Sequence, residues 1–162
     1  MSTTTKNETR IEAHPDLPTI TITREFDAPR ERVFRAWTER DLLVRWLGPR
    51  DAEWRIDTFD ARTGGSYRYA HLQDGEEVAS FYGSFHEVRP HERLVQTFTY
   101  EGAPDGVSLE TMTFEDLGDG RTRVVSLSVV DSMEVRDMIL ASGMDVGVIE
   151  GYEKLDSVLA EG

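Results

Sequence analysis

The apolar residues near the end of the chain have the spacing of one helix face. From residue 144 onward they recur every three or four positions, which aligns them along an α-helix. Ser142 and Asp145 have the spacing of an N-cap with a capping box, which marks the expected start. The pattern predicts one amphipathic helix over residues 142–162. Its apolar stripe consists of Met144, Val148, Tyr152, Leu155 and Leu159.

Two glycines lie inside this predicted helix, and a third precedes them. Gly147 and Gly151 are four residues apart, and Gly143 lies one further turn back. Each glycine in a helix interior costs about 1 kcal/mol relative to alanine. We interpret these glycines as a sign that another group approaches the helix backbone closely.

The middle of the chain has the two-residue period of β-strands. Residues 19–26 alternate in this way, with Ile20, Ile22 and Phe26 on one face. Between residues 51 and 131, turn-forming Gly, Pro and Asp residues separate further strands, and the short links predict antiparallel pairing. These strands are expected at residues 52–59, 66–73, 77–88, 93–100, 107–117 and 121–130.

Two short helices are predicted between the first strand and the others. Pro29 suits the first turn of one helix. Thr38 and Asp41 have the spacing of a capping box that opens the second helix, which ends at Gly48-Pro49. The apolar faces of the two helices consist of Val33, Phe34, Trp37, Leu42, Leu43, Trp46 and Leu47.

This order of elements predicts an α+β fold. Seven strands form one strongly curved antiparallel sheet, and the long C-terminal helix packs against one of its faces. A helix is about 10 Å wide and cannot fill the concave face of such a sheet alone, so we expect a cavity between helix and sheet. Residues 1–17 are expected to form a flexible lead-in, and residues 18–162 a single domain.

Composition and charge exclude several classes of function. The formal net charge of −13 disfavours nucleic acids and anionic membranes, because phosphate contacts need clustered lysine or arginine. The absence of cysteine excludes disulfides, thiolate catalysis and cysteine-based metal sites. No apolar run is long enough for a membrane span, and the N-terminus lacks the pattern of a secretory signal. We therefore expect a cytoplasmic monomer or homodimer that does not insert into membranes.

Several short segments of the chain are distinctive. They are Phe26-Asp27-Ala28-Pro29, Arg45-Trp46-Leu47-Gly48-Pro49, Asp60-Ala61-Arg62-Thr63-Gly64-Gly65, Gly83-Ser84-Phe85-His86-Glu87 and Gly151-Tyr152. Together they resemble the bacterial START-like domains, and in particular the homologues of the activator of the heat-shock chaperone ATPase. The resemblance extends over about residues 19–160.

This resemblance implies the helix-grip fold of the SRPBCC superfamily, to which the birch-pollen allergens belong, with a hydrophobic ligand cavity. Members of the superfamily bind lipids, sterols, polyketides or plant hormones, and a few catalyse cyclisation or dehydration. The eukaryotic namesake stimulates a chaperone ATPase with the help of a separate N-terminal domain, for which this chain has no room. A chaperone partner is therefore the weaker expectation.

Aromatic residues and methionines dominate the elements that are expected to face the cavity. Such a wall suits a small apolar or aromatic ligand, so non-catalytic binding of such a ligand is the favoured hypothesis. Arg62, His71 and His86 are the candidate polar groups of the cavity. The predicted wall consists of Trp37, Trp46, Trp54, Phe59, Tyr67, Tyr69, Phe81, Phe98, Met112, Met144, Val148 and Tyr152.

No group of residues predicts a specific catalytic centre. The chain lacks a G-x-S-x-G motif, zinc-ligand spacings of histidine and a phosphate-binding glycine loop, so we predict no metal and no cofactor. The second hypothesis is a cyclase, dehydratase or hydrolase that uses Tyr67, His86 or Asp60 for acid–base chemistry in the same cavity. The third is a module that contacts a chaperone or a regulator through an exposed apolar patch.

Overall fold

The structure, a computed structural model, describes residues 7–161. Its main element is an eight-stranded antiparallel sheet with the order β1-β2-β8-β7-β6-β5-β4-β3. The strands are β1 (Arg10–Ala13), β2 (Thr19–Phe26), β3 (Glu53–Phe59), β4 (Ser66–Gln73), β5 (Glu76–Arg89), β6 (Arg93–Tyr100), β7 (Ser108–Gly118) and β8 (Arg121–Val129). The helices are α1 (Arg30–Thr38), α2 (Arg40–Trp46), α3 (Met133–Ala141) and α4 (Met144–Ala160).

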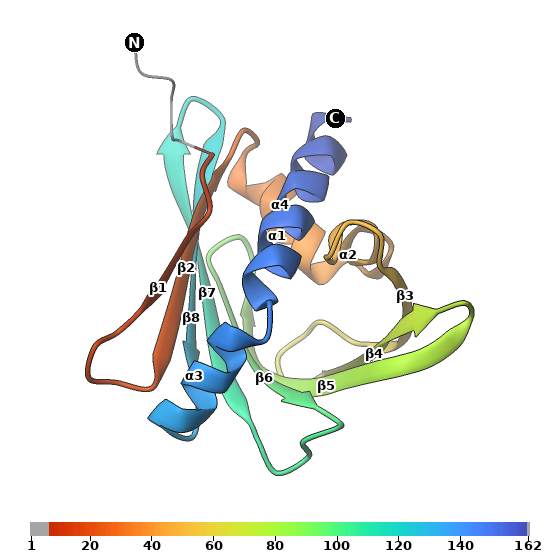
Figure 1. The fold of residues 1–162 in the computed structure, drawn as a ribbon. Helices are drawn as coiled ribbons and strands as arrows, with labels where there is room; N and C mark the ends of the chain where they lie inside the picture. Colours follow the sequence, from red (N-terminus) through yellow and green to blue (C-terminus); the bar gives the residue numbers. More distant parts are fainter. Residues whose placement is uncertain (1–6, 162) are drawn as a thin grey trace.

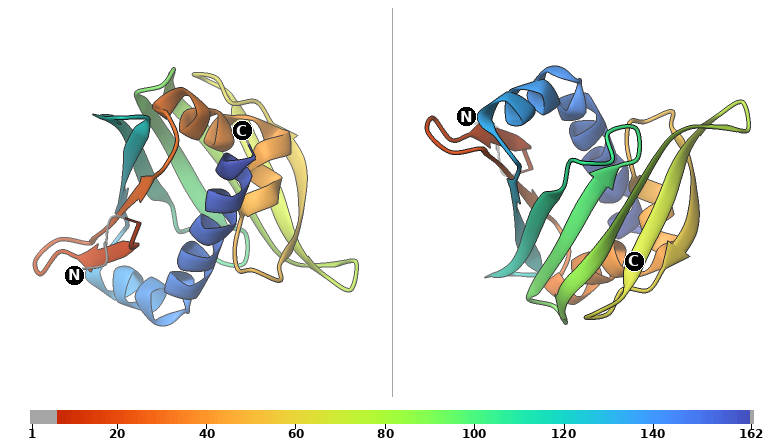
Figure 2. Two further views of the ribbon diagram at one scale, coloured as in Figure 1. Left: turned by 90° about the horizontal axis from the view of Figure 1, so that it is seen from above. Right: turned by 90° about the horizontal axis from the view of Figure 1, so that it is seen from below.

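The sheet curves around α4, which lies on its concave side (Figure 1, Figure 2). Helices α1 and α2 cover one end of this concave side, next to the C-terminal half of α4, and α3 lies beyond the other end of α4. The predicted α+β helix-grip architecture is confirmed. Its consequence for function is that one long helix has to cover most of a broad concave surface.

The sheet has one strand more than predicted. β1 pairs antiparallel with β2, from Arg10 opposite Thr23 to Ala13 opposite Ile20. It lies within the segment that the sequence analysis assigned to a structureless lead-in, so that assignment is wrong for residues 10–13. The segment is short and mostly polar, and only Ile11 packs against the core. Its strand conformation comes from pairing with the edge of β2, which no local pattern reveals. Residues 1–6 of the lead-in lie outside the described residues.

The predicted C-terminal helix begins later than expected, and a separate helix precedes it. Gly143 has a left-handed backbone (φ 89°) and divides α3 from α4. Ser142 ends α3, where its backbone N–H and its hydroxyl both donate to the carbonyl oxygen of Ile139. The predicted capping box of Ser142 is therefore wrong. The unpredicted helix α3 begins at Ser132, whose Oγ accepts a hydrogen bond from the Val135 N–H at 3.1 Å.

The second predicted capping box does not form either. The N-cap of α2 is Glu39, and no side chain bonds to the free N–H groups of this end. Thr38 instead belongs to the last turn of α1, where its hydroxyl donates to the Phe34 carbonyl oxygen at 3.0 Å. Helices α1 and α2 follow each other without a loop, so the residue expected as a cap is used as a helical residue.

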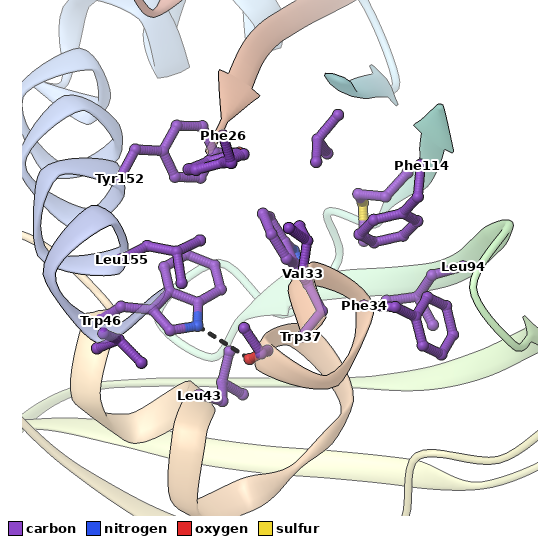
Figure 3. Close-up of a cluster of buried hydrophobic side chains, with 14 of the residues drawn as sticks. Phe26, Val33, Phe34, Trp37, Leu43, Trp46, Leu94, Phe114, Tyr152 and Leu155 are labelled. Carbon is purple, nitrogen blue, oxygen red and sulfur yellow. Dashed lines mark hydrogen bonds between the residues drawn. The ribbon is translucent and has the colours of Figure 1, made fainter. Parts of the chain in front are cut away.

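Large side chains fill the end of the concave side that α1 and α2 cover (Figure 3). Phe26 packs edge-on against Tyr152, and Phe114 packs edge-on against Phe34, with ring centroids 5.4 Å and 5.1 Å apart. The Trp46 indole N–H donates to the Ala36 carbonyl oxygen at 2.9 Å, which satisfies its polar atom inside the core. This part of the molecule is a closely packed aromatic core.

Two glycines allow α4 to cross the chain directly after α2. A Cβ added to Gly48 would lie 1.9 Å from the Gly147 carbonyl oxygen, and a Cβ on Gly151 would lie 2.9 Å from the Trp46 carbonyl oxygen. Both positions therefore need glycine because backbone meets backbone there. A Cβ on Gly147 would come no closer than 3.9 Å to its neighbours. The interpretation that something approaches the helix backbone closely is confirmed at Gly151.

Candidate functional site

A cavity of about 310 Å³ lies between α4 and the sheet. Strands β3 to β8 contribute its sheet side, and α4 together with the chain around the end of α2 contributes the opposite side. The wall is mainly aromatic and aliphatic. It consists of Trp37, Leu43, Trp46, Leu47, Gly48, Trp54, Phe59, Tyr67, Tyr69, Phe85, Gln96, Phe98, Glu110, Met112, Ser126, Met144, Gly147, Val148, Gly151 and Tyr152.

The apolar residues predicted from the sequence come together at this cavity, with one exception. Phe81 does not border it, and the other residues of the predicted wall do. The Phe81 ring instead stacks on Phe98 at 5.3 Å and lies 5.5 Å from Tyr100. Phe81 lies directly opposite Tyr69 on β4, so it is on the same face of the sheet and packs beside the cavity wall. Ligand binding by this wall stays a prediction.

The predicted polar groups lie elsewhere. Arg62 is exposed in the turn after β3 and forms an ion pair with Asp60 at 2.8 Å. His71 stacks against Trp54, with ring centroids 5.2 Å apart, and does not border the cavity. His86 is exposed because its neighbour Phe85 points inward and successive strand residues point to opposite faces. Assigning these three side chains to the cavity is wrong.

Three polar residues that sequence reasoning missed border the cavity: Gln96, Glu110 and Ser126. Glu110 on β7 lies opposite Gln96 on β6 and Ser128 on β8. Gln96 donates from Nε2 to one carboxylate oxygen of Glu110 at 3.0 Å, and Ser128 Oγ lies 3.5 Å from the other. Glu110 lies two residues before Met112, a predicted wall residue on the same strand. Residues two apart on a strand point to the same face, so this spacing could have placed Glu110 on the inner face.

Tyr67 extends this polar group across the sheet. Its hydroxyl donates to the Thr97 carbonyl oxygen at 2.6 Å and lies 3.4 Å from Nε2 of Gln96. Gly83 on the neighbouring strand leaves room for the Tyr67 side chain, because a Cβ there would lie 2.6 Å from the Tyr67 hydroxyl. The resulting chain of contacts from Tyr67 through Gln96 to Glu110 holds the carboxylate at a fixed position in the cavity wall.

The cavity changes the acidity of its ionisable groups. Desolvation raises the pKa of Glu110 to about 6, although the hydrogen bonds from Gln96 and Ser128 act in the opposite direction. Burial also raises the pKa values of Tyr67, Tyr69 and Tyr152, an effect that the negative charge of Glu110 strengthens. The phenols stay protonated at neutral pH, whereas the carboxyl group titrates close to it.

Several polar atoms in the wall have no partner among the described residues. The Ser126 and Tyr152 side chains are only 8% and 7% exposed, yet neither hydroxyl has a hydrogen bond within residues 7–161. The Tyr69 hydroxyl also has no hydrogen bond within residues 7–161, and the Trp54 indole N–H is buried with no acceptor in the described chain. Of these four atoms the Trp54 indole nitrogen is the fully buried one, and because buried polar groups without partners are rare in proteins, it calls for an explanation.

The described residues contain no cluster of three or more His, Asp or Glu side chains that would suit a metal ion. Among the helices of residues 7–161, none is both long and apolar enough to cross a membrane.

The comparison with family models agrees with this architecture. The model for "Activator of Hsp90 ATPase homolog 1-like protein" matches residues 27–160, which is most of the chain. The chain belongs to this family. The match covers the whole cavity wall and, apart from Phe26, the rings of the aromatic core. No protein of curated function matches the chain significantly.

Solved bacterial structures have the same fold. A crystal structure of a Rhodobacter sphaeroides protein is 25% identical, covers 96% of this chain and 100% of its own, and has a TM-score of 0.86. A solution structure from Arthrobacter aurescens is 28% identical, covers 94% and 92%, and has a TM-score of 0.84. Protein Ms6760 from Mycobacterium smegmatis is 25% identical, covers 93% and 95%, and has a TM-score of 0.82. These likenesses support the fold, and the function has to be argued from the site.

Proposed function

We propose that this protein binds a small, mainly apolar or aromatic ligand in the cavity between α4 and the sheet, without transforming it. The observation that carries the proposal is an aromatic-walled cavity of about 310 Å³ whose wall includes the Ser126 and Tyr152 hydroxyls, which bond to no residue within 7–161. Ligand sites in proteins are typically apolar hollows of about 300–1,000 Å³ with a few fixed polar groups. The volume, the wall and the polar group around Glu110 all fit that description.

Stability arguments also favour a binding role. Protein interiors are packed as densely as organic crystals, and unfilled space is destabilising. The same molecule fills the neighbouring end of its concave side with large aromatic rings, so the open end does not reflect a shortage of such residues. A ligand would supply both the missing apolar contacts and the missing hydrogen-bond partners of Ser126 and Tyr152.

The enzyme hypothesis has one specific observation in its favour, which is the carboxyl group of Glu110. A group whose pKa is about 6 is suited to general acid–base chemistry at neutral pH. We place this hypothesis second because His86 and Asp60, two of its candidate residues, are exposed outside the cavity. Conversion of a bound ligand that Glu110→Gln abolishes would raise it above simple binding.

The family name suggests contact with an Hsp90-type chaperone. Leu109, Leu127 and Val129 lie exposed on neighbouring strands β7 and β8, where Leu109 is directly opposite Val129. This apolar group is small, whereas the interaction hypothesis calls for a large exposed patch, and the hypothesis leaves the cavity unexplained, so we place it third. It predicts that Leu127→Thr abolishes stimulation of an Hsp90-type ATPase by this chain.

Two measurements test ligand binding. Mass spectrometry of an organic extract of the purified protein should detect a retained small molecule. In a fluorescence titration with naphthylmethanol as an apolar probe, Ser126→Leu should weaken binding about tenfold because leucine occupies part of the cavity. Val125→Leu is the matched control, since Val125 directly precedes Ser126 on β8 and points to the opposite face of the sheet. Equal affinities for the two variants would contradict the proposal.

A further inference from the structure

Among the described residues, the cavity wall contains an acidic side chain but no basic one. Glu110 is the one carboxylate that borders the cavity, and no lysine, arginine or histidine among residues 7–161 does so. Its protein partners, Gln96 and Ser128, are neutral. A buried carboxylate without a counter-ion is costly, and proteins normally pair such a charge. The wall therefore lacks a positive charge at Glu110.

The buried cation on the neighbouring part of the sheet does not supply this charge. Arg24 acts electrostatically on Tyr152, but its guanidinium forms two hydrogen bonds, of 2.8 Å and 2.6 Å, with the carboxylate of Asp156. Arg24 also lies over the Phe26 ring, 4.8 Å from its centroid. The Asp156 carboxylate on α4 thus neutralises Arg24, and the guanidinium packs against the aromatic core.

The aromatic wall is well suited to a positive charge. The faces of Trp and Tyr rings attract cations, and several such rings around one carboxylate form the kind of cage that binds ammonium groups. The Tyr67 hydroxyl reaches Glu110 through Gln96, and the Tyr67 ring stacks on Tyr69 with centroids 5.6 Å apart. Both rings border the cavity together with Tyr152, whose phenol also senses the charge of Glu110. A neutral apolar ligand would gain hydrophobic contact with these rings but no cation–π attraction.

The available hydrogen bonds complement an N–H donor. Nε2 of Gln96 already donates to Glu110, and the Glu110 oxygens have further lone pairs. The hydroxyls of Ser126 and Tyr152 have no partner in the described residues and can accept a hydrogen bond. The site therefore presents several acceptors around one charged group.

From this arrangement we infer that the ligand is an organic cation, whose ammonium group is bound by Glu110 and whose apolar part lies among the aromatic rings. The inference rests on the proposed ligand-binding function and specifies its chemical class. The net charge of −13 supports it, because a strongly acidic protein attracts cations and repels anions over a distance.

Three probes of similar size and shape test the inference: naphthylmethylammonium, naphthylmethanol and naphthylacetate. Wild-type protein should bind the cation about tenfold more tightly than the alcohol, and the acetate most weakly. Glu110→Gln should remove the preference, so that this variant binds the cation no more tightly than the alcohol. Glu115→Gln is the matched control, because it removes the same charge from the same strand at a residue that pairs with Arg123 outside the cavity.

The affinity for the cation should also depend on pH in a defined direction. The groups that face Glu110 are the phenols of Tyr67, Tyr69 and Tyr152, and these stay neutral throughout the range. Cation affinity should therefore be constant between about pH 7 and pH 8, where the probe keeps its charge, and fall as the pH drops through about 6, where Glu110 becomes protonated. Glu110→Gln should show no such fall.

The outcomes separate this inference from the function on which it rests. If wild-type protein binds the alcohol as tightly as the cation, or if Glu110→Gln keeps the preference for the cation, the inference is overturned and ligand binding stands. Tighter binding of the acetate overturns it as well. If none of the three probes binds, both the inference and the proposed function fail.

Discussion

The two ends of the concave side of the sheet have opposite characters, although the same helix covers both. At the end near α1 and α2, Phe26, Phe114 and Leu155 are almost completely buried and the rings pack edge to face. At the other end, Glu110 and Tyr67 border open space. The first end has the features of a structural core, and the second has the features of a binding site.

The difference follows from the side chains that α4 presents to each end. Helices α1, α2 and α4 contribute to both the packed core and the cavity wall, but α4 supplies Leu155 and Leu159 to the core and Gly147, Val148 and Gly151 to the cavity. The α4 residues at the open end are small or slender, as Gly147 and Val148 illustrate. The comparison teaches that the cavity results from the small residues of α4 at this end, and not from a lack of aromatic residues in the chain.

The largest effect should come from truncating the packed end. Phe114→Ala should lower the free energy of unfolding by about 3–5 kcal/mol, because it removes a buried ring that contacts Phe34 and Trp37 and leaves a cavity. Met144→Ala at the open end should cost only about 1 kcal/mol, because Met144 already borders empty space. Denaturant unfolding of both variants measures the difference. Similar losses would show that the two ends are equally packed.

The glycines of α4 should respond differently to the same substitution. Gly151→Ala should destabilise by about 1–3 kcal/mol, because its Cβ would lie 2.9 Å from the Trp46 carbonyl oxygen. Gly147→Ala should be neutral or stabilising by up to about 1 kcal/mol, because the site has room and alanine favours the helix. Thermal unfolding of the two variants distinguishes the sites. A clear loss at Gly147 would mean that the open end is filled by packing.

Glu110→Gln should stabilise the protein, and the gain should depend on pH. The pKa of Glu110 is raised to about 6, above the value of about 4.3 in unfolded chains, so its ionisation opposes folding. The gain should be absent below about pH 4, develop between pH 4 and pH 6, and reach about 1–2 kcal/mol above pH 6. Unfolding free energies of both proteins at pH 4 and pH 8 measure it, and other carboxylates cancel in the comparison. A gain independent of pH would contradict the raised pKa.

The smallest effect is expected at His86. His86→Ala should change the free energy of unfolding by less than about 0.5 kcal/mol, because the side chain is exposed on the outer face of β5. Binding of naphthylmethanol should be unchanged, because His86 does not border the cavity. Isothermal titration of the variant checks the second point. A substantial loss of binding would show that the outer face of the sheet takes part in ligand recognition.

The strand pattern and the helix spacing were enough to predict the fold and most of the apolar cavity wall. Alternation in the strands and the three- and four-residue spacing in α4 are local properties, set by which residues can face a core. Met112 and Tyr152 were accordingly placed where the structure has them. These signals depend on neighbours in the sequence, so the sequence by itself determined them.

The polar part of the site depended on tertiary structure. Glu110, Gln96 and Ser128 form one group because three strands pair in a particular register, and a shift of one residue would turn each side chain to the other face. His86 lies outside the cavity for the same reason, because its side chain points to the outer face of β5. The strand β1 likewise arises from pairing between distant segments. Sequence alone determined which residues prefer an interior, whereas tertiary structure decided which polar groups share it, because burial of a charge depends on its partners in space.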